Sequence, residues 1–206
     1  MRIANAPCSW GVLEFDGMEK SAPCAQVLDE IASTGYAGTE LGDWGFMPTE
    51  PAKLSDELSR RSLAMLGAFV PVRLADASTH RDGIATAVRT ARLLEATGEA
   101  PVIVLADDCG KDRMRVARAG RIIRDDGLSP DQWATFARGS NDIARAVRDE
   151  TGLRTVLRVE DGATRPACAP SSTRIARASS RRRGRWTSSW HGPTPRSSGS
   201  ASTPAT

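Results

Sequence analysis

The sequence predicts an α/β fold built on a parallel sheet. Apolar segments of strand length alternate with segments whose apolar residues recur at helical spacing. Two of the apolar segments are nearly continuous runs, which is typical of strands that are buried on both faces. Regular alternation of strands and helices is typical of βαβ units, so we expect a parallel sheet covered by helices.

The first elements are organised around a glycine-bounded segment. Arg2–Cys8 is a short apolar opening that predicts the first strand, and Ala22–Thr34 follows with apolar residues at helical spacing. Gly35 is expected to close that helix, because glycine adopts a left-handed cap without a steric penalty. Tyr36–Leu41 is then predicted as the second strand, and Gly42 as its end.

The next helix and strand follow directly. Pro51–Arg61 is predicted to be helical, since proline suits the first turn and two leucines share one face. Leu63–Val70 is almost wholly apolar and predicts a buried strand, which Pro71 is expected to end.

The remaining elements repeat this pattern. Arg81–Thr97 is predicted as the third helix, and His80 before it as a solvated surface residue. Pro101–Ala106 is an apolar strand with an Asp-Asp pair just past its end. Ser129 is expected to cap a fourth helix, because Pro130 suits the first helical position and Gln132 at the third comes close to a capping box. That helix is expected to end near Thr151, and a fifth strand is expected at Leu153–Val159.

Motif absences narrow the fold. No GxGxxG sequence follows the first strand, which argues against a dinucleotide-binding domain, and no GxxxxGK[ST] sequence for a phosphate-binding loop is present. A (β/α)8 TIM barrel fits the alternation better, but such a barrel needs roughly 250 residues. With about five strands and four helices, the 206 residues are therefore expected to form the N-terminal half of a TIM barrel, followed by a disordered tail.

Composition excludes several functional classes. The four cysteines include no CxxC pair and there are two histidines, so no Cys/His zinc motif is available. The N-terminus lacks the apolar region of a secretory signal, and no run of about 18 apolar residues predicts a membrane span. We therefore expect a cytoplasmic protein that does not contact membranes.

Several stretches resemble a known family. The chain is similar to the xylose-isomerase-like TIM barrels, the sugar phosphate isomerase/epimerase superfamily, and within it most resembles the inosose dehydratases of inositol catabolism. The likeness extends from residue 1 to about 157. It is carried by the stretches Asn5–Glu14, Gly35–Gly42, Gly67–Val70, Val102–Asp108 and Asp126–Trp133.

The resemblance implies a metal-dependent lyase or isomerase/epimerase that acts on a small polyol ketone or sugar. In this family a divalent metal, often manganese or cobalt, polarises the substrate carbonyl while a base removes a neighbouring proton. Its carboxylate and histidine ligands come from later strands, including an Asp-Thr-Gly-His stretch, and the corresponding positions are missing here apart from Glu160 as a candidate ligand. The chain is therefore expected to bind no metal, to be truncated and inactive, and to self-associate through exposed barrel edges. The catalytic residues stay unassigned.

Five residues are candidates for substrate binding. Glu40 lies near a strand's C-terminal end, where barrels of this kind carry their chemistry, although it could simply pair with a local arginine. Asn5 and Trp10 could line the pocket, with the indole as a wall for a sugar ring, or Trp10 could only pack over the barrel mouth. Asp107 and Asp108 could bind substrate hydroxyls or cap the following turn.

The last part of the chain differs in composition. We expect a domain at residues 1–160 and a disordered, basic, Ser/Arg/Pro-rich tail at 161–206, which carries no Asp or Glu after residue 161. One explanation is a reading-frame shift between about residues 158 and 184. Back-translation of residues 185–206 with a one-base slip permits a reading that ends in Asp-Thr-Gly-His. The alternatives are another isomerase or epimerase of the superfamily, or a non-enzymatic α/β module whose basic tail contacts nucleic acid, although no folded scaffold in the tail favours nucleic acid.

Overall fold

The parallel sheet expected from the sequence is present. A computed structural model describes residues 3–11, 22–98, 100–108, 121, 127–158 and the backbone of 175–177. The strand order is β1-β2-β3-β4-β5-β6. Strands β1 to β5 pair in parallel with their sequence neighbours, whereas β6 pairs antiparallel with β5. The strands are Ala4–Asn5, Gly38–Glu40, Ala64–Val72, Val102–Asp107, Arg154–Arg158 and Ile175–Arg177.

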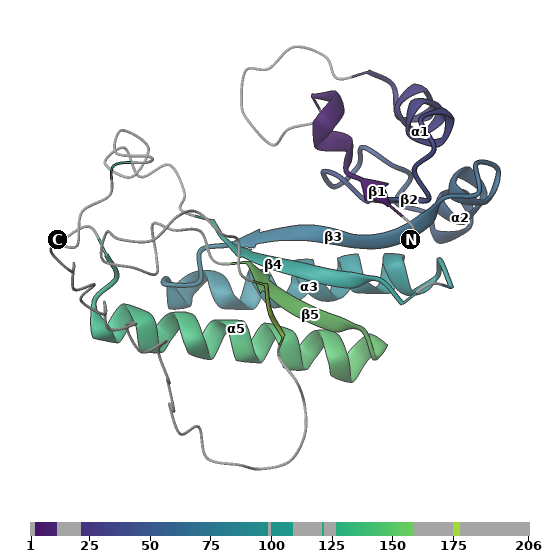
Figure 1. Cartoon of the computed structure of the whole chain (residues 1–206). Helices are drawn as coiled ribbons and strands as arrows, with labels where there is room; N and C mark the ends of the chain where they lie inside the picture. Colours follow the sequence, from purple (N-terminus) through teal and green to yellow (C-terminus); the bar gives the residue numbers. More distant parts are fainter. Residues whose placement is uncertain are drawn as a thin grey trace, which may run out of the picture.

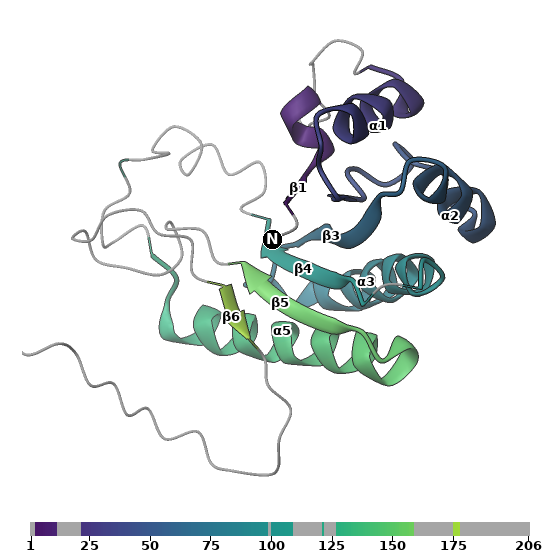
Figure 2. The same cartoon turned by 45° about the vertical axis from the view of Figure 1, so that its right-hand side comes forward.

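The helices connect these strands in the predicted order. They are α1 (Cys24–Ser33), α2 (Pro51–Ser59), α3 (His80–Glu95) and α5 (Pro130–Thr151), and two short 3₁₀ turns are η1 (Pro7–Trp10) and η2 (Ala77–Thr79). In Figure 1, α3 and α5 lie side by side under strands β3, β4 and β5. Figure 2 shows the labelled helices on the outer side of the curved sheet. The fold is therefore part of a TIM-barrel-like α/β structure.

Local signals in the sequence explain the helix ends. Gly35 and Gly42 have φ angles of 86° and 72°, the left-handed conformation that glycine adopts most easily. At the start of α5, Ser129 Oγ accepts a hydrogen bond from the Gln132 N–H at 3.2 Å, and Gln132 Oε1 accepts one from the Ser129 N–H at 2.8 Å. The predicted capping box is thus confirmed.

The two faces of the sheet differ in how well they are covered. On the face toward α3 and α5, Ala68, Val70, Ile103 and Leu105 are at most 2% exposed. On the opposite face, which we call the inner face, strands β3, β4 and β5 place Phe69, Val104 and Val156, all only half-buried. Apolar side chains thus cover one face fully and leave the other partly open to solvent.

Two expectations about strand boundaries were wrong. The first strand is short, because Pro7–Trp10 forms a 3₁₀ turn. Pro71 does not end β3, which continues to Val72 and pairs with β4 through both residues. Pairing of β3 with β2 stops at Gly67, so Pro71 lies where β3 has no partner on that side, and a residue without an N–H is tolerated there.

No helix in the described part of the chain has both the length and the apolar character needed to cross a bilayer.

Candidate functional site

Polar residues end four of the parallel strands. Asn5, Glu40, Asp107 and Arg158 are the last residues of β1, β2, β4 and β5. In a parallel sheet these ends meet at one edge, the edge that carries the active site in barrels of this class. Three of the four were predicted as site residues, whereas Arg158 was not.

The register divides these residues between the two faces of the sheet. A Cβ atom added at Gly83 of α3 would lie 2.7 Å from Val72 Cγ1, so Val72 faces the helices. Asp107 pairs with Val72 and therefore shares that face. Ala106 and its β5 partner Arg158 point to the inner face instead.

Glu40 reaches the inner face through a register shift. Strand β3 has one extra residue, Leu66, because Thr39 pairs with Met65 but Glu40 pairs with Gly67. Gly67 is five positions from Val72 and so lies on the other face. Without the shift, Glu40 would point to the same face as Asp107.

Glu40 and Arg158 influence each other electrostatically. Burial raises the pKa of the Glu40 carboxyl above its usual range, because the charged form loses solvation, and the Arg158 guanidinium opposes part of this rise. A carboxyl group with a raised pKa exchanges protons closer to neutral pH than an ordinary glutamate does.

Asp108 extends the inner-face site by one residue. Its N–H donates to the Val72 carbonyl at 2.9 Å, so the ladder continues past β4 and the alternation places Asp108 on the same face as Ala106. We call Glu40, Asp108 and Arg158 the inner-edge cluster. It combines a carboxyl of raised pKa, a second carboxyl and a guanidinium, groups that can bind and orient a molecule with several hydroxyls.

Asp107 has a structural contact on the helix side. It is 7% exposed, and its Oδ1 accepts a hydrogen bond from the Leu74 N–H at 3.0 Å. The Leu74 carbonyl lies 2.9 Å from His80 Nε2 at the start of α3. His80 is half-buried rather than solvated, which corrects the expectation for this residue. Asp107 thus anchors the turn after β3.

Asn5 and Trp10 make local contacts near the N-terminus. Asn5 Oδ1 accepts hydrogen bonds from the Ala6 N–H at 2.9 Å and the Ser9 hydroxyl at 2.8 Å, and so fixes the start of η1. Trp10 Nε1 donates to Glu30 Oε2 of α1 at 2.6 Å. Hydrogen bonds from Gln26 and Trp10 lower the pKa of Glu30. Substrate contact by either residue stays a prediction.

The described residues do not fit a metal ion. Among them, no three His, Cys, Asp or Glu side chains gather in a way that could hold a metal. The Arg158 guanidinium also places a positive charge beside Glu40, which disfavours a cation there. Glu160, the candidate ligand, lies outside the described residues.

Sequence reasoning missed Arg158. Its position could have identified it, because Arg158 ends a mostly apolar segment. The last side chain of a parallel strand lies at the functional edge of the sheet.

Comparison with known proteins supports the predicted relationship. An inosose dehydratase of Salmonella agona is 33% identical over 88 residues, which are 43% of this chain and 27% of that protein. An inosose dehydratase of Geobacillus kaustophilus is 26% identical over 163 residues, or 78% of this chain and 51% of the relative. The resemblance to the inosose dehydratases is confirmed. No model of a protein family matches the sequence.

A solved structure shares the fold. The apo form of 3-keto-D-glucoside 4-epimerase from E. coli superposes with a TM-score of 0.53 at 14% identity, over 76% of this chain and 55% of the epimerase. At this identity the match shows the fold alone. The chain covers 27% and 51% of the two inosose dehydratases, so at most about half of such a relative is represented.

Proposed function

We propose that this chain is the N-terminal part of a barrel most like a metal-dependent inosose dehydratase of the sugar isomerase/epimerase superfamily. The observation that carries the proposal is the inner-edge cluster, in which β2, β5 and the residue after β4 each bring a charged group to the functional edge of a sheet. The inosose dehydratase relatives support the substrate class, a small polyol ketone, in inositol catabolism.

In this proposal the inner-edge cluster binds the substrate. Arg158 donates hydrogen bonds to substrate oxygens, since a guanidinium offers five N–H donors and no acceptor. Asp108 accepts from substrate hydroxyls. Glu40, when protonated, can donate as well as accept, because its pKa is raised by burial. These residues would hold and orient a polyol without supplying the complete chemistry.

We propose that the metal, manganese or cobalt, acts in the intact relatives and that this chain does not bind it. The family chemistry needs a Lewis acid beside the substrate carbonyl, and the inner-edge cluster lacks a suitable set of ligands. We therefore propose that the chain is truncated relative to an active enzyme, with residues 1–160 as the partial barrel and 161–206 as a basic tail that results from a frameshift. A cytoplasmic location is part of the same proposal.

The partly open inner face supports self-association. Val104 and Val156 are half-buried on a face that the rest of a closed barrel would cover, and Leu66 at the bulge is 46% exposed. Burying such apolar surface against a second copy is favourable. Among the described strands β1 is the outermost of the sheet, so its outer edge could pair with a further strand.

A dehydration assay tests the proposed function. The purified chain is incubated with inosose and Mn²⁺ or Co²⁺, and the dehydrated product is quantified beside the Salmonella agona inosose dehydratase as a positive control. We expect the relative to turn over and this chain to give no product above the metal-only blank. Metal-dependent dehydration by this chain would contradict the claim of inactivity.

Substrate binding provides the second part of the test. We expect the chain to bind inosose weakly by ligand-observed NMR, and Arg158→Gln to abolish the signal while the exposed-site variant Arg138→Gln retains it. If both variants bind inosose equally well, Arg158 is not part of the substrate-binding site.

A further inference from the structure

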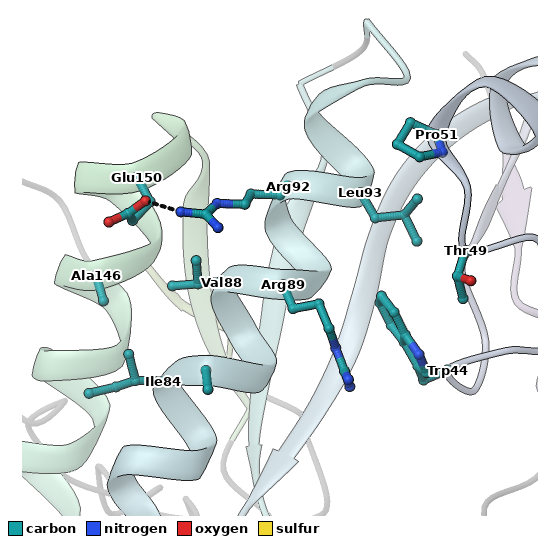
Figure 3. A pocket seen from close by; sticks show the side chains of 11 residues that line it. Trp44, Thr49, Pro51, Ile84, Val88, Arg89, Arg92, Leu93, Ala146 and Glu150 are labelled. Carbon is teal, nitrogen blue, oxygen red and sulfur yellow. Dashed lines mark hydrogen bonds and ion pairs between the residues drawn. The ribbon is translucent and has the colours of Figure 1, made fainter.

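A groove on the outer helical layer lies away from the inner-edge cluster. It has a volume of about 700 Å³ and runs over the outer surface of α3, between the loop that carries Trp44 and the C-terminal part of α5. Figure 3 shows Trp44 and Arg89 facing each other on one side of α3, and Arg92 bonded to Glu150 of α5 on the other. We call this the α3 groove.

The lining of the α3 groove is mainly apolar. Ile84, Val88 and Leu93 of α3 form its floor, and Ala146 of α5 adds an apolar contact on one side. The groove is open to solvent along one side, so a small organic molecule in it would contact these apolar side chains on the other. Trp44 is 41% exposed, which leaves much of a large aromatic surface in contact with solvent.

The charges of the α3 groove sum to one positive charge. Arg92 forms an ion pair with Glu150 at 2.5 Å, so these two charges compensate each other. The Cζ atom of Arg89 lies over the Trp44 ring, 4.1 Å from the ring centroid. Among the residues that the structure describes, Arg89 has no ion-pair partner. Arg89 therefore supplies the charge that a ligand would meet.

The stacked arginine suits an anion. A guanidinium that lies over an aromatic ring can still donate N–H groups to the two oxygens of a carboxylate. The ring restricts the side chain, so less conformational freedom is lost when the anion binds. An apolar body attached to that carboxylate would lie on the α3 floor.

We propose that the α3 groove binds an organic carboxylate with an apolar, ring-sized body. Its carboxylate accepts hydrogen bonds from Arg89, and its body contacts Trp44 and the apolar residues of α3. The site is independent of the proposed polyol site, because the groove lies on the helical layer and the inner-edge cluster on the opposite face of the sheet.

Three probes separate the contributions of charge and apolar surface. They are 1-naphthaleneacetate, its neutral analogue 1-naphthaleneacetamide, and acetate, each measured on the full chain by ligand-observed saturation-transfer NMR. We expect naphthaleneacetate to bind with a Kd of about 1 mM, as its size allows. The amide should bind about fivefold more weakly, since it lacks the charge, and acetate should give no signal.

Variants place the binding in the groove. Arg89→Gln should weaken naphthaleneacetate about fivefold and leave the amide unchanged, while Trp44→Leu should weaken both probes. The exposed α5 variant Arg138→Gln is the matched control for loss of a charge, and Arg158→Gln is the control for carboxylate binding at the inner face. The proposal is overturned by the absence of naphthaleneacetate binding, by equal affinities for acid and amide, or by weakening in a control variant that matches that of Arg89→Gln.

Discussion

Substitution of Gly139 by alanine tests the contact between α5 and the start of α3. Gly139 is buried, and a Cβ atom there would lie 2.4 Å from His80 Nε2 and 2.5 Å from His80 Cε1. Real Cβ atoms do not approach so closely, so the imidazole must move. Since His80 Nε2 lies 2.9 Å from the Leu74 carbonyl, this movement breaks the hydrogen bond that holds the turn after β3.

The expected loss of stability combines three effects. Overpacking of a filled site costs about 2 kcal/mol, and the lost hydrogen bond about 1 kcal/mol. Alanine in place of glycine inside a helix returns about 1 kcal/mol. Gly139→Ala should therefore lower the free energy of unfolding by about 2 kcal/mol.

A double-mutant cycle isolates the contact. In the His80→Ala background the ring and its hydrogen bond are already absent, so Gly139→Ala should instead raise the free energy of unfolding by about 1 kcal/mol through helix propensity. Urea unfolding followed by far-UV circular dichroism measures all four proteins at one concentration, because association would shift apparent stability. If Gly139→Ala has the same effect in both backgrounds, the assigned contact is wrong.

Three further predictions concern other parts of the chain. Because the pKa of Glu40 is raised in the folded state, its protonated carboxyl stabilises the fold fully below the unfolded pKa, and this stabilisation is lost as pH rises through the folded pKa. Glu40→Gln removes the buried charge, so it should raise the free energy of unfolding at pH 7 but not at pH 4. Equal effects on urea unfolding at both pH values would refute this. Ser129→Ala should cost about 1 kcal/mol of unfolding free energy, more than Ser140→Ala, whose hydroxyl bonds only within α5; similar losses would argue against the cap. Val104→Lys should reduce self-association measured by sedimentation velocity, whereas Ala134→Lys at an exposed position of α5 should not. If neither variant changes the association, the inner face is not the contact surface.

The order and type of the elements could be predicted because local signals were strong. The capping box at Ser129 and the left-handed glycines Gly35 and Gly42 act through neighbouring backbone atoms, so a short stretch of sequence contains all the information. Apolar spacing identified the helices for the same reason.

The sequence did not predict to which face of the sheet each site side chain points, because this depends on the pairing between strands. The extra residue in β3 at Leu66 changes the register and turns Glu40 to the inner face, away from Asp107. Similarly, Pro71 remains inside β3 because β2 ends earlier, which is a property of the neighbouring strand and not of the proline. Two acids at adjacent positions, Asp107 and Asp108, consequently have different surroundings.

The burial of His80 also depended on a distant residue. The imidazole has room against α5 because Gly139, far along the chain, has no side chain. A histidine at a helix start is often solvated, and nothing next to it in the sequence indicated otherwise.

The central claim is that the chain carries one part of a longer catalytic barrel, with a change of reading frame after β5. Sequencing the genomic DNA across codons 155–185 tests this most directly. We predict a single-base insertion or deletion. Its correction should replace the Ser- and Arg-rich tail with a translated sequence that contains acidic and apolar residues and the stretch Asp-Thr-Gly-His. A confirmed frame without such a slip, with the same Ser- and Arg-rich ending encoded in related genes, would contradict it.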